Sequence, residues 1–199
     1  MKGRTMVQLI AFHDRTYVPL RFISETLGGR VAYNAMKKRA VIRTPSGQQD
    51  YETLMSGDLT KAREIVTGLL FVYENGVERL PLTGEGFTTK LTFPKGEALR
   101  VKQDYKGMTW YAEVDSDGLL VVRWQKDNLG EKRETGTTPE PFGEAVYFTD
   151  SFIVNSLAYG TINEDRVETQ LGLINRDDNQ EYKGVIVIPI EGEVRTDAR

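Results

Sequence analysis

Residues 15–42 read RTYVPLRFISETLGGRVAYNAMKKRAVI, and the N-terminal part of the chain is organised around them. Pro19 follows a β-branched and aromatic run and stands where a helix can begin, because the first helical turn needs no amide hydrogen there. Three apolar residues then recur at the spacing of one helix face: Leu20, Ile23 and Leu27. Gly28 ends the helix, because a C-terminal cap favours the positive φ that glycine adopts freely.

Strands are predicted on both sides of this helix. Val7–Phe12 is rich in residues that favour strands, and a turn at residues 13–15 leads into the short return strand before Pro19. After the helix, apolar and polar residues alternate over two further segments, 30–34 and 39–43. We therefore predict a small strand, helix, strand, strand unit over residues 1–46.

This unit resembles the copper amine oxidase N-terminal domain-like family, also called the stalk domain family, over about residues 6–44. The positions that carry the resemblance are Arg15, Thr16, Val18, Pro19, Leu20, Arg21, Glu25, Leu27, Gly28, Val31, Tyr33 and Ile42. Four of them, Arg15, Pro19, Arg21 and Gly28, are assigned here as structural motif residues. The sequence departs from the family at His13-Asp14, where Asn-Gly is usual, and at Tyr33, where Trp is usual.

The resemblance implies a non-catalytic module, typical of surface or secreted bacterial proteins, that contacts the cell wall or a neighbouring domain. The family name refers to copper, but His13 is the single histidine and the chain has no cysteine. A copper site built from several histidines is therefore excluded, and we predict no cofactor, no metal site and no catalytic residue.

Residues 47–199 are predicted to form a β-rich domain. Turn signals recur at intervals of about 9 to 11 residues, the rhythm of an antiparallel β-sandwich or barrel-like domain. The fold class is therefore α+β, mostly β. Further expectations are a linker at 44–50, one or two helical turns near Asp58, a hairpin at Asn75-Gly76, a long exposed loop at 129–143, a last strand at 185–190 and a frayed tail at 191–199.

The best candidate ligand-binding residues form an aromatic group: Tyr105, Trp110, Tyr111 and Trp124. On strands, Trp110, Ala112 and Val114 would share one face, and Val122 and Trp124 another. Aromatic rings on an exposed sheet face could stack on sugar rings, whereas core packing is the more common fate of Trp.

Two acidic runs resemble the start of a calcium loop, at Asp115–Gly118 and at Asn175–Glu181. Such a loop needs a bidentate Glu at its position 12. Lys126 and Ile186 stand there instead, so polar turns are the favoured interpretation of both runs.

The charge is unevenly spread along the chain. Residues 1–45 carry nine Lys or Arg against two acidic residues, a net charge of +7, and the remainder carries 17 basic and 27 acidic residues, or −10. A nucleic-acid-binding domain is usually strongly basic, so we expect no nucleic-acid partner. No apolar run approaches the roughly 20 residues of a membrane helix, so no membrane span is expected.

The absence of cysteine fits an extracytoplasmic or cell-surface protein of a Gram-positive-type bacterium whose leader is missing from this chain; a cytoplasmic location stays open. We expect a binding or scaffold module that contacts cell-wall glycan or another protein surface, with an oligomer as an open alternative.

Two other functions stay open. One is a proteinase-inhibitor-like module, since Trp110–Lys126 loosely resembles part of the bacterial intracellular proteinase inhibitor family. The other is a carboxylate-dependent hydrolase with an accessory stalk-like unit.

Overall fold

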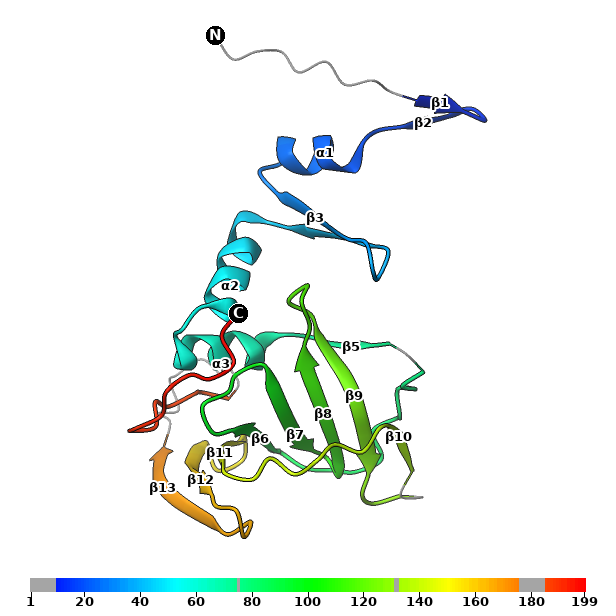
Figure 1. The fold of residues 1–199 in the computed structure, drawn as a ribbon. Helices are drawn as coiled ribbons and strands as arrows, with labels where there is room; N and C mark the ends of the chain where they lie inside the picture. The colour runs from blue at the N-terminus through cyan, green and yellow to red at the C-terminus, as the bar shows by residue number, and fades with distance from the viewer. Residues whose placement is uncertain (1–9, 75, 131–132, 176–184) are drawn as a thin grey trace. The chain divides into compact units, whose positions relative to one another are not determined.

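The computed structural model describes residues 10–74, 76–130, 133–175 and 185–199. The chain divides into two compact units, Met1–Glu52 and Thr53–Arg199. Within the described residues, most of the secondary-structure elements are strands (Figure 1), which confirms the predicted α+β, mostly β class. None of the described helices is long and apolar enough to span a membrane.

The N-terminal unit is built from two β-hairpins and a short helix, which confirms the predicted order. Its elements are β1 (Ile10–Phe12), β2 (Arg15–Tyr17), α1 (Leu20–Thr26), β3 (Arg30–Asn34), β4 (Arg39–Arg43) and the first part of α2 (Pro45–Met55). Pro19 is the N-cap of α1, and Gly28 follows the helix with φ +77°, the left-handed conformation expected of a cap glycine.

The apolar face of α1 is exposed. The exposed fractions of Leu20, Ile23 and Leu27 are 46%, 43% and 79%. Between residues 11 and 52 the one buried side chain is that of Ser24, whose hydroxyl donates to the Leu20 carbonyl. The described part of this unit therefore has no apolar core.

Two helices replace segments that the sequence predicted otherwise. The predicted linker at 44–50 is wrong: α2 begins at Pro45, and the Thr44 hydroxyl accepts a hydrogen bond from the amide of Gly47. The helix expected near Asp58 is longer than one or two turns, because α3 (Leu59–Gly68) has 10 residues. Asp58 caps α3 as predicted, accepting from the amide of Lys61 at 3.0 Å.

The second unit is built on one sheet of nine described strands. Its path is β10-β9-β8-β7-β6-β11-β12-β13, antiparallel throughout, and β5 pairs with β9 in parallel (Figure 1). The strands are β5 (Phe71–Tyr73), β6 (Thr88–Pro94), β7 (Arg100–Tyr105), β8 (Met108–Val114), β9 (Leu120–Asp127), β10 (Glu134–Gly136), β11 (Ala145–Ser151), β12 (Ser156–Ile162) and β13 (Glu168–Asn175). The nine described strands of this unit are thus hydrogen-bonded into a single sheet. The predicted hairpin at Asn75-Gly76 includes Asn75, which lies outside the described residues.

One face of this sheet carries the core. Ala62 and Val66 of α3 pack there with Phe93, Val101 and Ala112. A second cluster on the same face joins Leu80, Met108, Trp110 and Val122. Strand residues alternate between the two faces, so the residues between these core positions point to the opposite face.

The C-terminal segment departs from two predictions. Residues 185–190 form no strand, although Val187 is 4% exposed and packs into the core. The tail is not frayed, because the Glu193 carboxylate pairs with Arg63 at 2.7 Å, with side chains 4% and 2% exposed.

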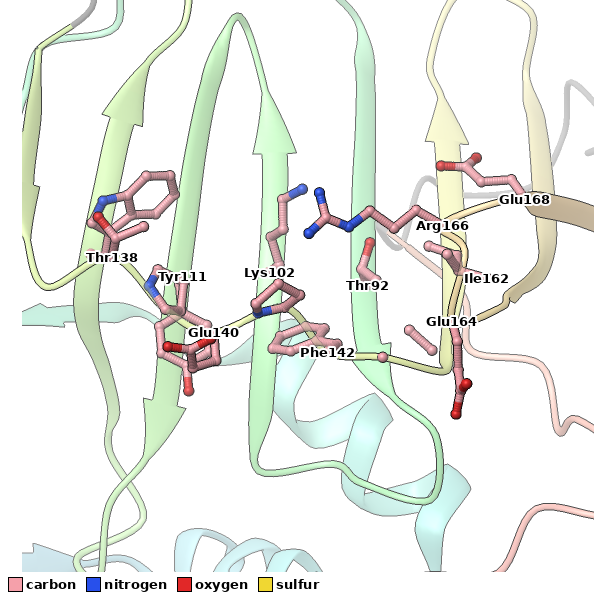
Figure 2. A pocket seen from close by; sticks show the side chains of 15 residues that line it. Thr92, Lys102, Tyr111, Thr138, Glu140, Phe142, Ile162, Glu164, Arg166 and Glu168 are labelled. Carbon is pink, nitrogen blue, oxygen red and sulfur yellow. The ribbon is translucent and has the colours of Figure 1, made fainter.

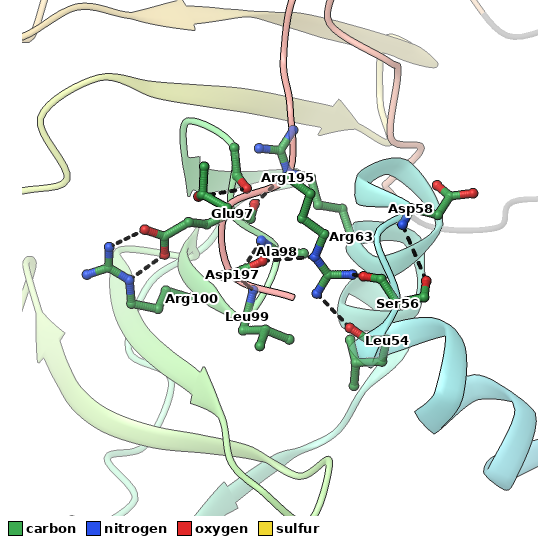
Figure 3. A network of polar contacts seen from close by, with 12 residues as sticks. Leu54, Ser56, Asp58, Arg63, Glu97, Ala98, Leu99, Arg100, Arg195 and Asp197 are labelled. Atoms are coloured by element: carbon green, nitrogen blue, oxygen red, sulfur yellow. Dashed lines mark hydrogen bonds and ion pairs between the residues drawn. The ribbon is translucent and has the colours of Figure 1, made fainter. Parts of the chain in front are cut away.

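Further contacts fix the same tail (Figure 3). Arg195 donates to the carbonyls of Leu54 and Ser56, and the Asp197 carboxylate accepts from the amides of Ala98 and Leu99 at 2.9 and 2.6 Å. The charged residues of this tail, which the sequence predicted to be solvated, therefore form hydrogen bonds with backbone groups of the second unit.

Candidate functional site

A groove of about 420 Å³ crosses the face of the sheet opposite α3. Four neighbouring strands supply its floor, with Thr92 from β6, Lys102 from β7, Tyr111 from β8 and Trp124 from β9 (Figure 2). The remaining walls come from the segment between β10 and β11, from the turn after β12, and from single residues at the ends of β11, β12 and β13. They are Thr138, Pro139, Glu140, Pro141, Phe142, Gly143, Ala145, Ile162, Glu164, Arg166 and Glu168.

A β-bulge places Trp124 in this groove. Tyr111 pairs with Trp124, but the next pair is Ala112 with Val122, so β9 has one extra residue at this point. The prediction that Val122 and Trp124 share a face is therefore wrong: Val122 lies in the core cluster and Trp124 lines the groove. A bulge adds a residue that simple alternation does not anticipate.

The aromatic candidates are divided between the two sides of the sheet. Trp110 packs in the core cluster with Tyr105 at its edge, and its indole N–H donates to Gln125 Oε1 at 3.1 Å. Tyr111 and Trp124 lie together in the groove, 7% and 8% exposed. The four residues do not form one exposed platform.

The segment after β10 lies across the groove. Gly136 has φ +89°, and a Cβ there would lie 2.1 Å from the Arg123 carbonyl oxygen, so only glycine fits this close approach to β9. The Phe142 ring then packs against Tyr111, with ring centroids 5.9 Å apart. The described part of the predicted 129–143 loop is therefore held on the sheet rather than projecting from it.

The phenol of Tyr111 is buried at the floor of the groove, and its pKa is shifted. Burial raises the pKa of its phenol above the usual value of 10.0, and its hydrogen bond to Glu113 adds to the shift. Glu113 in turn pairs with Arg123 at 3.3 Å. The phenol is therefore a neutral hydrogen-bond donor throughout the physiological pH range.

Trp124 brings an unsatisfied donor to the groove. Its indole N–H is buried and has no hydrogen-bond partner within the described part of the chain. A buried donor without a partner costs about 1–3 kcal/mol, so an acceptor on a ligand would relieve that cost.

Both signs of charge line the groove. Lys102 and Arg166 are the cations, and the carboxylates are Glu140, Glu164 and Glu168. All three carboxylates are exposed, and Glu168 accepts a hydrogen bond from Lys90. Together with the two cations, they give the rim of the groove charged groups that could bind polar parts of a ligand.

Phe142 and Arg166 were missed by the sequence reasoning. Phe142 follows Pro139 and Pro141 in a polar segment that has the composition of a loop. The prolines favour an extended backbone, which was the only sign in the sequence that this segment could lie along a sheet. Arg166 sits in a polar turn, and nothing in the sequence marks it out.

Neither acidic run assembles a metal site among the described residues, where no group of three or more metal-ligating side chains occurs. Asp115 Oδ1 instead accepts from the amides of Asp117 and Leu119, which makes a tight turn between β8 and β9. The second run, Asn175–Glu181, lies outside the described residues beyond Asn175.

Comparison with known proteins identifies the N-terminal segment. Residues 2–53 match the family model of the copper amine oxidase N-terminal domain, which confirms the resemblance found in the sequence. Its motif residues lie in β2 (Arg15), before α1 (Pro19), within α1 (Arg21) and after it (Gly28). No curated protein and no solved structure matches the chain. The groove lies wholly outside the matched residues.

Proposed function

We propose that this chain is a non-catalytic, extracytoplasmic binding module that contacts cell-wall glycan through the groove of its second unit. The observation that carries the proposal is the groove itself, where the rings of Tyr111, Trp124 and Phe142 meet polar side chains. The match of residues 2–53 to a stalk-type family supports a setting at the cell wall.

The groove suits a carbohydrate because it combines apolar rings with hydrogen-bonding groups. Sugar rings present a flat C–H face and a rim of hydroxyls, and binding sites of this size usually pair apolar walls with a few polar groups. Phe142 is half-buried and offers part of its ring, while Thr138 and Glu140 are exposed beside it. The unpartnered N–H of Trp124 offers a further donor to a hydroxyl.

Neither alternative function gains an observation in its favour. The carboxylates of the groove are exposed, whereas the acid of a hydrolase is usually buried in an apolar pocket. The described residues of 129–143 lie against the sheet, where an inhibitor needs a projecting, rigid loop.

Retention on purified peptidoglycan tests the proposal. We expect the full chain to be retained at low salt, and Phe142→Ala to reduce retention because it removes the half-buried ring that the groove offers to a ligand. Phe152→Ala is the matched control, since Phe152 is 61% exposed outside the groove. No retention of the wild type, or equal retention of both variants, would contradict glycan binding by this groove and leave a partner protein as the ligand class to be tested.

A further inference from the structure

We infer that the groove holds an oxyanion, a carboxylate or phosphate group of the ligand, between Lys102, Arg166 and the hydroxyl of Thr92. The identity of the polymer that bears this anion rests on the proposed function. The anion site itself rests on the charges and contacts described next.

Two cations converge over the middle of the groove. Figure 2 shows the Lys102 ammonium and the Arg166 guanidinium directed toward one another, with the Thr92 hydroxyl directed toward the Arg166 side chain. They come from different parts of the sheet, β7 and the turn between β12 and β13. Two like charges brought together repel each other. An anion bound between them is attracted to both, so the net electrostatic interaction becomes favourable.

The turn that carries Arg166 is fixed by local hydrogen bonds. The amide of Arg166 donates to the Asn163 carbonyl at 2.9 Å, and the Asn163 side chain accepts from the amide of Val167 at 2.8 Å. Arg166 itself has φ +63°, in the left-handed region that is uncommon for a residue with a side chain. This arrangement gives the base of the guanidinium arm a defined position beside the groove.

Five other cations of the same sheet and its turns each form an ion pair with a carboxylate. The pairs are Lys90 with Glu168, Lys95 with Glu144, Arg100 with Glu97, Arg123 with Glu113 and Lys126 with Glu134. Arg166 has no ion pair and no side-chain hydrogen bond within the described part of the chain. Lys102 is only partly compensated, since Asp104 lies 3.6 Å from its ammonium at an exposed position.

Thr92 completes the site. It is 5% exposed at the floor of the groove, and its hydroxyl makes no hydrogen bond within the described residues. A guanidinium, an ammonium and a hydroxyl are donors of the kind that bind carboxylate and phosphate oxygens. The nearby carboxylates do not fill this place, because Glu168 is held by Lys90 and Glu164 points away from the cations in Figure 2.

Titration with simple anions tests the site without any polymer. Inorganic phosphate and acetate would be added separately to the ¹⁵N-labelled full chain at constant ionic strength, and amide chemical shifts recorded. We expect one or both anions to shift the amides of Thr92, Lys102 and Arg166. Arg166→Met and Lys102→Met should each weaken binding about tenfold, the effect of losing one charge-assisted hydrogen bond.

Lys126→Met is the matched control, because Lys126 lies on β9 of the same sheet, outside the lining of the groove, and the variant loses the same charge. It should bind as the wild type does. The inference is overturned if neither anion shifts the groove amides, if Arg166→Met binds as tightly as the wild type, or if Lys126→Met weakens binding equally. Circular dichroism of each variant checks that the sheet is intact.

Two forms of purified cell wall separate the sources of the anion. Wall stripped of its phosphodiester polymers with hydrofluoric acid retains the protein if the anion is a carboxylate, and untreated wall alone retains it if the anion is a phosphate. Anion binding without retention on either form contradicts the glycan proposal while supporting the site. Retention without anion binding supports the glycan proposal and overturns the site.

Discussion

Arg63 is a charged side chain that the second unit buries almost completely, at 1% exposed. Its guanidinium donates to the Pro94 and Glu97 carbonyls and pairs with the Glu193 carboxylate. Arg63→Met leaves that carboxylate buried without its partner, and breaking a buried pair on one side costs about 3–5 kcal/mol. Urea denaturation of the variant should show this loss in the free energy of unfolding.

The matched control is Arg100→Met. Arg100 also makes a two-point ion pair, with Glu97, but its side chain is 43% exposed. Exposed ion pairs contribute about 0–1 kcal/mol, so this variant should unfold almost as the wild type does. Equal losses in the two variants would contradict the claim that burial of the Arg63 pair makes it important.

Asp127 should make stability depend on acid pH. Its carboxylate accepts from the amides of Leu129 and Gly130 and from the Thr83 hydroxyl, and these bonds hold its pKa below the usual 3.8. A lowered pKa stabilises the folded state above 3.8, and that contribution is lost as the pH falls through the lower folded-state value. Asp127→Asn should therefore melt at a lower temperature than the wild type at neutral pH.

The melting temperatures of Asp127→Asn and the wild type should converge as the solution is acidified below that range. A difference that stays constant from neutral to strongly acid pH would contradict the assignment, because it would show that the carboxylate's charge is not the cause.

At the scale of elements, the C-terminal segment 191–199 acts as a structural strap rather than a free tail. It supplies Glu193 to Arg63, Arg195 to the carbonyls of Leu54 and Ser56, and Asp197 to two amides after β6. Truncation after Ile190 removes all of these contacts and should cost at least as much stability as Arg63→Met. Val194→Ala is the control, because Val194 is 76% exposed in the same segment. A truncated chain that melts as the wild type does would contradict this role.

Elements with local signals were predictable, and those that depend on distant partners were not. The cap at Asp58 and the stop at Gly28 follow from the conformations those residues favour. The strap was not predictable, because the partners of Glu193 and Asp197 lie 130 and 99 residues earlier in the sequence. Helix α2 was missed because its polar, glycine-containing sequence has the composition of a linker.

The candidate site was only partly predictable for the same reason. Tyr111 and Trp124 belong to the predicted aromatic group, but the bulge that brings them to one face is not visible in alternation. Lys102 and Arg166 meet only because β7 and the β12–β13 turn share the sheet face, which requires the strand order. Strand pairing between distant segments is the information that a single sequence lacks.

At the scale of the whole molecule, the two units differ in how much apolar surface they bury. Every buried apolar side chain among the described residues lies in Thr53–Arg199. A fragment of residues 53–199 should therefore unfold in one cooperative thermal transition close to that of the full chain, while a fragment of residues 1–52 should show none. A cooperative transition in the short fragment, measured by circular dichroism, would contradict this division.

The most direct measurement of the central claim is an amide chemical-shift map of the full chain with soluble peptidoglycan fragments added. Glycan binding by the groove predicts shifts grouped on Thr92, Lys102, Tyr111, Trp124 and Phe142, with the amides of α3 on the opposite face unchanged. Two results would contradict glycan binding by the groove. One is a set of shifts confined to residues outside the groove, and the other is the absence of any shift although intact wall retains the wild type.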